Sequence, residues 1–152
     1  MAKVLITGGY GLVGHRVSLE LMNEGHDVVI VDNRNDYGII PKAEMDYTFE
    51  ARKVIVGSVK SYAIDICSTD FKAVMVKEKP EVVIHLASYP RQKIVNKNPQ
   101  LASSVIIGGT INVIESCKKF GVKRILFASS SMVYGEFDDG IKAVSYTHLT
   151  LP

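Results

Sequence analysis

The sequence contains only two cysteines, Cys67 and Cys117, and they lie far apart in the chain. Neither occurs in a spacing typical of a zinc site, and two isolated thiols do not form a disulfide framework. We therefore predict no metal site and expect both cysteines to be buried and reduced. This usage is typical of a protein that works in the cytoplasm.

The sequence also lacks a large excess of one charge. Its 18 Lys and Arg residues stand against 16 Asp and Glu residues, and the basic residues form no block. This argues against nucleic acid or an acidic membrane surface as the principal partner. No apolar run is long enough to span a bilayer, and no secretory signal is visible, so we expect no membrane association. The 152 residues suffice for one domain with a hydrophobic core.

What the sequence does have is a glycine-rich stretch near its start. An apolar run ends at Thr7, and glycines follow at Gly8, Gly11 and Gly14 before a helical pattern begins. Gly8 permits a tight turn, Gly11 lets the backbone approach a pyrophosphate, and Gly14 lets the helix pack closely on the strand. The free N–H groups of the helix N-terminus would then face the anion. The stretch predicts dinucleotide binding, and the alternative is a purely structural turn.

An acidic residue follows at the distance that such a site requires. Asp32 ends a second apolar run, nearly twenty residues after the glycines. A carboxylate at the end of this strand can accept hydrogen bonds from the adenosine ribose hydroxyls. It also repels a 2′-phosphate, which favours NAD over NADP, although the neighbouring Arg34 weakens that preference. The alternative is a solvated turn aspartate.

Strand-like and helix-like segments alternate along the chain. We expect strands at 3–7, 27–32, 61–66, 81–87 and 123–128, and helices at 12–24, 42–52, 68–79 and 99–120. Residues 54–57 are apolar and fit either a strand or a buried turn. The alternation predicts an α/β protein with a doubly wound parallel sheet of the Rossmann type and right-handed crossovers. Its ligand crevice should lie at the carboxyl ends of the strands.

Two patterns resemble catalytic residues but have a simpler interpretation. His85 lies inside an apolar strand, so we expect a core histidine that is hydrogen-bonded to a neighbour. Tyr89 and Lys93 have the Tyr-x-x-x-Lys spacing of a proton-transfer pair, which needs a helix to bring both side chains to one face. Pro90 favours a loop, so we interpret this match as chance. The glycine pair at 108–109, inside a predicted helix, indicates close approach of another backbone or of a ligand.

Several short motifs together resemble the NAD-dependent epimerase/dehydratase group of extended short-chain dehydrogenases/reductases, which acts on nucleotide sugars. They occur in the order typical of that family, at residues 7–14 (TGGYGLVG), 31–33 (VDN), 64–66 (IDI), 85–88 (HLAS), 109–112 (GTIN) and 129–135 (SSSMVYG). The chain resembles the N-terminal part of such a protein. We therefore expect an incomplete NAD-binding domain over residues 1–143, with a sheet that stops after about five strands.

The resemblance implies a role for each matched position. The residues that would hold NAD are Gly8, Tyr10, Gly11, Leu12 and Gly14 at the pyrophosphate, Asp32 and Asn33 at the adenosine ribose, Asp65 and Ile66 at the adenine, and Leu86, Ala87 and Ser88 at the cofactor ribose. Ser130 matches the active-site Ser/Thr of the family, whose hydroxyl would hydrogen-bond the reacting sugar oxygen. Tyr134 belongs to the Val-Tyr-Gly signature and is not the catalytic tyrosine.

The sequence departs from the family in two places. Ile106 stands where the family usually has an asparagine, which puts a polar contact near the nicotinamide in doubt. The catalytic Tyr-x-x-x-Lys pair expected after Gly135 is absent, so we predict that the chain alone is inactive. The resemblance implies a parent enzyme that moves a hydride between NAD and a sugar carbon of a nucleotide sugar, as an epimerase, dehydratase or reductase. It also leaves a homodimer open as the assembly of that parent. The alternative is a non-catalytic NAD(P)-binding sensor on the same fold.

The last nine residues, 144–152 (VSYTHLTLP), do not resemble this fold. They match the conceptual translation of a transposase-type sequencing-library adapter, and we expect them to be a non-native tail. The alternative is a natural polar tail. Sequencing reads from the genome that continue through codon 144 into the same residues would contradict the adapter interpretation.

Overall fold

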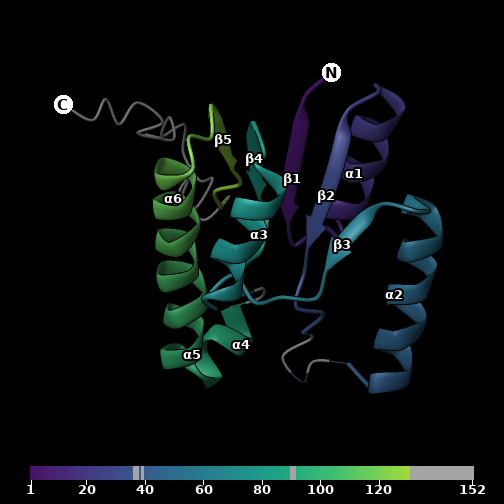
Figure 1. Cartoon of the computed structure of the whole chain (residues 1–152). Helices are drawn as coiled ribbons and strands as arrows, with labels where there is room; N and C mark the ends of the chain where they lie inside the picture. The colour runs from purple at the N-terminus through teal and green to yellow at the C-terminus, as the bar shows by residue number, and fades with distance from the viewer. Residues whose placement is uncertain (36–37, 39, 90–91, 131–152) are drawn as a thin grey trace, which may run out of the picture.

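The computed structural model describes residues 1–35, 38, 40–89 and 92–130, with only the backbone described for 92–94. Within these ranges the chain forms one parallel sheet with helices on both faces (Figure 1). The strands are β1 (Lys3–Thr7), β2 (Asp27–Val31), β3 (Lys60–Tyr62), β4 (Val82–His85) and β5 (Arg124–Phe127). Their order in the sheet is β3-β2-β1-β4-β5, and every pairing is parallel. The predicted doubly wound Rossmann-type α/β sheet is thus confirmed.

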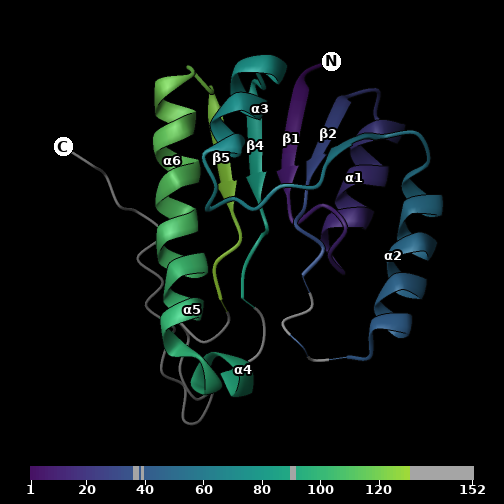
Figure 2. The same cartoon turned by 60° about the horizontal axis from the view of Figure 1, so that its bottom comes forward.

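Helices connect the strands in the predicted alternation. They are α1 (Gly14–Asn23), α2 (Lys42–Val56), α3 (Asp70–Glu78), α4 (Gln92–Lys97), α5 (Pro99–Ser103) and α6 (Thr110–Lys119), with a π-helical turn η1 (Ser104–Gly109) between the last two. Figures 1 and 2 show α1 and α2 on one side of the molecule and α3 and α6 on the other. Among the described residues no helix is both long and apolar enough to cross a membrane.

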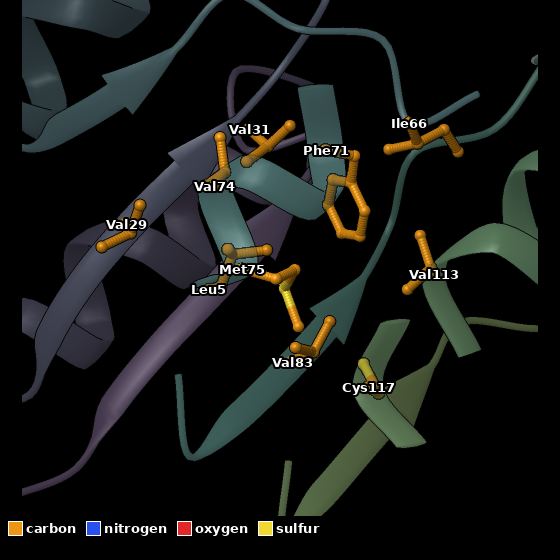
Figure 3. Packing of buried hydrophobic residues seen from close by; sticks show 10 residues of the cluster. All are labelled: Leu5, Val29, Val31, Ile66, Phe71, Val74, Met75, Val83, Val113 and Cys117. Carbon is orange, nitrogen blue, oxygen red and sulfur yellow. The ribbon is translucent and has the colours of Figure 1, made fainter. Parts of the chain in front are cut away.

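Alternation along the strands divides the core between the two faces of the sheet, because successive side chains of a strand point to opposite faces. On one face, Leu5 of β1 and Val83 of β4 pack with Phe71 and Met75 of α3 and Val113 of α6 (Figure 3). The cluster on the other face consists of Val4, Ile6 and Val28, with Val17, Leu21 and Met22 of α1 packed against them. The sheet is therefore buried on both sides in its centre, as the continuous apolar runs of β1 and β2 predict.

The edge strand β5 is less covered than the central strands. Ile125, Leu126 and Phe127 retain exposed fractions of 37%, 46% and 58%. On the neighbouring helix, Ile111 and Ile114 are also exposed. The described residues thus leave apolar surface open at this side of the sheet.

Several sequence expectations need correction. Residues 54–57 form neither a strand nor a buried turn, because α2 continues to Val56 and ends at Gly57, whose φ is +60°. Val54 is exposed and only Val56 of this run is buried, next to Tyr10. Val13, expected on the buried stripe of α1, is 59% exposed. Cys67 is exposed, whereas Cys117 is buried as expected.

The third strand and the long helix also differ from their predicted forms. β3 stops at Tyr62, so residues 64–66 leave the sheet and turn toward its carboxyl edge. The helix predicted at 99–120 is present but contains the π turn, which ends at Gly109. Such turns are often found at functional sites. The proposed boundary at residue 143, Tyr134 and the tail 144–152 lie outside the described residues.

Candidate nucleotide-binding site

A cleft of about 510 Å³ lies at the carboxyl edge of the sheet. It lies where β1 and β4 are neighbours, which is the topological switch point of the sheet, because successive strands are added on one side of β1 and then on the other. Ligands usually bind at this position in open α/β sheets. The cleft brings together all the residues predicted to hold the cofactor: Gly8, Tyr10, Gly11, Leu12, Gly14, Asp32, Asn33, Asp65, Ile66, Leu86, Ala87 and Ser88. They come from the ends of four chain segments that are far apart in the sequence.

The glycine-rich turn depends on the absence of side chains at two positions. Gly8 has a φ of +71°, and a Cβ atom there would lie 2.8 Å from the backbone nitrogen of Ala87. A Cβ atom at Gly14 would lie only 2.2 Å from the carbonyl oxygen of Gly8. Gly14 therefore permits α1 to pack onto the turn itself, where we expected it to pack onto the strand. The turn is closed by a 2.9 Å hydrogen bond from the Gly11 N–H to the Gly8 carbonyl.

Asp32 is held at the end of β2 by backbone donors on both oxygens. Its Oδ2 accepts a 2.9 Å hydrogen bond from the Tyr10 N–H, and its Oδ1 accepts one of 2.7 Å from the Arg34 N–H. Arg34 adopts a left-handed backbone conformation, with φ of 56°. The carboxylate is thus tied to the glycine-rich turn, and its remaining lone pairs can accept from a ribose diol in the cleft.

The end of β2 is also linked to the segment after β3. The Asn33 amide donates a 2.9 Å hydrogen bond to Oδ2 of Asp65, and the Cys67 N–H donates one of 2.7 Å to Oδ1. Burial raises the pKa of Asp65, but these hydrogen bonds outweigh it and leave the pKa below its ordinary value. Asp65 is therefore ionised at neutral pH and fixes the loop that carries Ile66.

One wall of the cleft was not predicted from the sequence. Met45, Thr48, Phe49 and Arg52 of α2 line it. Their spacing of i, i+3, i+4 and i+7 places them on one helix face, and this periodicity is the signal that could have identified them. The wall is attached to the glycine-rich turn, because the Arg52 guanidinium donates a 2.9 Å hydrogen bond to the Tyr10 carbonyl.

An aromatic and cationic stack completes this wall. The ring of Tyr10 meets Phe49 edge-on, with 4.7 Å between the ring centroids. The guanidinium carbon of Arg34 lies 4.1 Å from the centroid of Phe49. Arg34 therefore lies over an aromatic face next to Asp32 in the cleft, where a cation–π contact holds it.

His85 is a buried core histidine, as predicted. Its Nδ1 lies 2.6 Å from Oγ1 of Thr7, and its Nε2 lies 3.0 Å from Oγ1 of Thr110. Burial lowers the pKa of His85 to about 4, so the ring is neutral at physiological pH. It is separated from solvent, which argues against a role as an acid or base that meets a substrate.

The candidate catalytic residues are not assembled with the cofactor cleft. Ser130 lies beyond the end of β5, is exposed and does not line the cleft. Tyr89 lies outside any helix, as expected, but Lys93 belongs to α4 and not to the predicted loop. One helix therefore does not carry both residues. Within the described ranges, no three His, Cys, Asp or Glu side chains are grouped so that they could hold a metal ion.

Comparison with known proteins gives the family of this chain. Residues 4–151 match the model of the NAD dependent epimerase/dehydratase family. Protein CapI of Staphylococcus aureus is 33% identical over 134 residues, which are 88% of this chain and 39% of that protein. A UDP-glucuronate 4-epimerase of Thermodesulfobacterium geofontis is 34% identical over 136 residues, covering 88% of this chain and 41% of the relative.

Solved structures agree with this assignment. A UDP-glucose-4-epimerase from Stenotrophomonas maltophila, crystallised with bound NAD and formylated UDP-arabinopyranose, superposes with a TM-score of 0.75 at 28% identity. The match covers 93% of this chain and 41% of that structure. The chain therefore belongs to the NAD dependent epimerase/dehydratase family, and it spans about two-fifths of the length of the relatives it matches.

Proposed function

We propose that this chain binds NAD and is the NAD-binding part of a nucleotide-sugar epimerase. The observation that carries the proposal is the position of Asp32: its carboxylate is fixed beside the glycine-rich turn, in the cleft at the end of β2. The NAD-bound epimerase structures that superpose on the chain support this use of the cleft. Relatives that act on UDP-sugars support a nucleotide sugar as the substrate of the longer protein.

The residues present fit a dinucleotide. The glycine-rich turn offers a surface without side chains at Gly8 and Gly11, next to the N-terminus of α1, where backbone N–H groups favour a pyrophosphate. Asp32 accepts from the adenosine ribose, and Asp65 and Ile66 border the adenine side. When bound, NAD supplies the hydride acceptor and donor for a sugar carbon. The protein residues then bind and orient the cofactor.

The acid–base step needs residues that the cleft does not supply from the part of the chain that the structure describes. In the proposed enzyme Ser130 hydrogen-bonds the reacting sugar oxygen, and a tyrosine lowered in pKa by a neighbouring lysine moves the proton. The only Tyr-x-x-x-Lys spacing in the sequence is Tyr89 with Lys93, and these residues do not share a helix. We therefore expect the 152-residue chain to bind NAD but to show no epimerase turnover.

A titration calorimetry series on the chain tests this proposal. NAD, NADP and ADP-ribose are each titrated into the chain, and NAD is titrated again into the Asp32→Ala variant. Saturable NAD binding that weakens at least about tenfold in Asp32→Ala is the expected result, because a charge-assisted hydrogen bond is lost. Absence of NAD binding, or binding that does not respond to Asp32, would contradict the proposed site.

A turnover assay tests the enzymatic part separately. The chain and a longer product of the same gene are incubated with UDP-glucose, UDP-galactose and UDP-glucuronate, and the sugars are separated. Conversion by the longer product alone is expected. Conversion by the 152-residue chain that disappears in Tyr89→Phe would show that Tyr89 is catalytic and our interpretation of it wrong. NAD binding without conversion of any nucleotide sugar by the longer product would favour a sensor.

A further inference from the structure

A series of hydrogen bonds, buried at Thr7 and His85 and exposed where Thr110 meets Ile106, links segments that border the cofactor cleft. Oγ1 of Thr7 accepts a 3.3 Å hydrogen bond from the Ala87 N–H and lies 2.6 Å from Nδ1 of His85. On the other side of the ring, Nε2 lies 3.0 Å from Oγ1 of Thr110. The Thr110 hydroxyl in turn donates a 2.5 Å hydrogen bond to the Ile106 carbonyl. This series of hydrogen bonds thus connects β1, β4 and the π turn.

The groups at the two ends of this hydrogen-bond series determine where its protons lie. The Thr110 hydroxyl has one proton and two close partners, and the Ile106 carbonyl, which only accepts, lies nearer at 2.5 Å than Nε2 of His85 at 3.0 Å, so we assign the proton to Ile106. Oγ1 of Thr110 must therefore accept from His85, which places the ring proton on Nε2. A neutral ring then has a bare Nδ1, which accepts the hydroxyl proton of Thr7. Each proton of this hydrogen-bond series then has one acceptor. The His85 ring accordingly has one tautomer and one orientation.

We propose that His85, as the Nε2–H tautomer, is a positioning residue that fixes three walls of the cofactor cleft relative to one another. These are the glycine-rich turn, the segment after β4, and the π turn with the neighbouring Ile66. This inference rests on the proposed NAD-binding function. His85 acts through its neighbours, because the buried ring is not among the residues that line the cleft.

The first two walls meet at Thr7. Thr7 directly precedes Gly8, and its side chain holds the Ala87 N–H. Gly8 and Ala87 are so close that a Cβ atom on Gly8 would lie 2.8 Å from the Ala87 nitrogen. A small rotation of Thr7 therefore changes the distance between the glycine-rich turn and the segment that lines the cleft after β4.

The third wall is reached through Thr110. Its hydroxyl bonds to the π turn, which contributes Val105 to the lining of the cleft. Gly109, directly before Thr110, packs on Ile66, which also lines the cleft. Loss of the His85–Thr110 hydrogen bond frees the π turn from the two strands, while the apolar core of α6 around Val113 stays in place.

The test uses Thr110→Val, which deletes the hydroxyl without changing the shape of the side chain much. Ser116→Ala is the matched control, because Ser116 lies on the same helix and its hydroxyl also donates to the carbonyl four residues earlier, at 2.6 Å from the Asn112 oxygen. Both variants lose one helical hydroxyl–carbonyl hydrogen bond, but only Thr110 contacts His85. His85→Gln and His85→Phe form a second pair, since a glutamine amide can still donate to Thr110 and a phenylalanine cannot.

Nuclear magnetic resonance of the chain with 15N-labelled histidine reads the tautomer directly, and backbone spectra read the coupling. We expect a protonated Nε2 and a bare Nδ1 for His85, and changed amide resonances of Gly8 and Ala87 in Thr110→Val but not in Ser116→Ala. We also expect NAD affinity to fall about fivefold to tenfold in Thr110→Val, to change less than about twofold in Ser116→Ala, and to be better retained in His85→Gln than in His85→Phe. Urea unfolding of each variant separates this effect from a general loss of stability.

A proton on Nδ1 would overturn the proposal. So would unchanged Gly8 and Ala87 amides in Thr110→Val, or equal losses of NAD affinity in Thr110→Val and Ser116→Ala. If the unmodified chain binds no NAD, the proposed function fails, and the tautomer and the amide changes still decide whether His85 links the three segments.

Discussion

A Cβ atom added to Gly109 would lie 2.6 Å from Cδ1 of Ile66, a distance that real Cβ atoms do not show. Gly109 ends the π turn, and Ile66 lines the cleft, where the proposed function expects the adenine. The glycine thus allows the long helical segment to lie directly against a residue of the candidate site. At the neighbouring Gly108, an added Cβ would meet nothing within 4 Å.

Gly109→Ala should therefore destabilise the chain, whereas Gly108→Ala should not. We expect a loss of about 2 kcal/mol for Gly109→Ala, the usual cost of overpacking a tight contact. Gly108→Ala should be neutral or stabilise by up to about 1 kcal/mol, because alanine favours a helix. Urea unfolding measures both. NAD affinity should fall only in Gly109→Ala, and equal behaviour of the two variants would contradict the contact.

The carboxylate of Asp32 should decide between NAD and NADP. We expect the chain to bind NAD more tightly than NADP, because a 2′-phosphate would approach this carboxylate. Asp32→Asn removes the charge and keeps one oxygen, which can accept from either the Tyr10 N–H or the Arg34 N–H but not from both. The variant should raise the ratio of NADP to NAD affinity about tenfold or more, because that ratio depends on the lost charge. Asp46→Asn, an exposed position of α2 outside the cleft, is the matched charge control. Tighter binding of NADP by the unmodified chain would indicate that Arg34 receives the 2′-phosphate.

Gly11 should be needed for binding more than for folding. Gly11→Val places a branched side chain where the pyrophosphate is expected, and we predict that NAD binding is lost. The first atom of that side chain would lie 3.0 Å from the Gly8 carbonyl oxygen, which requires only a small shift of the turn. The far-ultraviolet circular dichroism spectrum should therefore stay close to that of the parent chain. NAD affinity that remains unchanged would place the ligand elsewhere.

The sequence predicted those parts of the fold that depend on local patterns. The buried strands β1, β2 and β4 are continuous apolar runs, and the glycines after α1 and α6 adopt φ values of +79° and +72°, as helix stops require. Residues 54–57 were misjudged because an apolar run of four residues is equally compatible with a strand and with the end of a helix. Only tertiary packing, here Val56 against Tyr10, selects the helix.

The candidate site was predictable where a backbone motif defines it. The glycine-rich turn and Asp32 carry their own spacing signal, and the cleft contains both. The wall formed by α2 was missed because its residue spacing marks one helix face but does not show what that face contacts. The contacts of Phe49 and Arg52 with Tyr10 become visible only in the folded structure. The π turn also has no sequence signal that distinguishes it from an α-helix with two glycines.

An ion cluster at the other end of the sheet should make the chain sensitive to strong acid. The carboxylate of Glu78, on α3, is 1% exposed and lies 2.7 Å from the Lys60 ammonium and 3.4 Å from that of Lys3, and it accepts a hydrogen bond from the Tyr62 hydroxyl. Burial raises the pKa of Glu78, but the hydrogen bonds from Lys60 and Tyr62 outweigh it, and the pKa falls to about 2.

The pKa of Glu78 is about 4.5 in an unfolded chain and lower in the folded one, so ionised Glu78 stabilises the fold fully above about pH 4.5. This contribution is lost as the pH falls toward 2. Glu78→Gln should cost about 2 kcal/mol at pH 7, less than for a fully buried pair because both lysines are partly exposed. It should also flatten the stability curve between pH 4.5 and 2. A parent chain whose stability does not change over that range would contradict the depressed pKa.

His85 should produce a second loss of stability at milder acidity. Burial lowers its pKa from 6.5 to about 4, so the unfolded chain takes up a proton at a pH where the folded chain does not. The stabilising effect of the neutral ring is therefore complete above about pH 6.5 and is lost as the pH falls to 4, by up to about 3 kcal/mol. His85→Gln has no group that titrates in this range, so its urea midpoint should vary less between pH 6.5 and 4.5 than that of the parent chain. A parent slope that is retained in His85→Gln would assign the titration to another group.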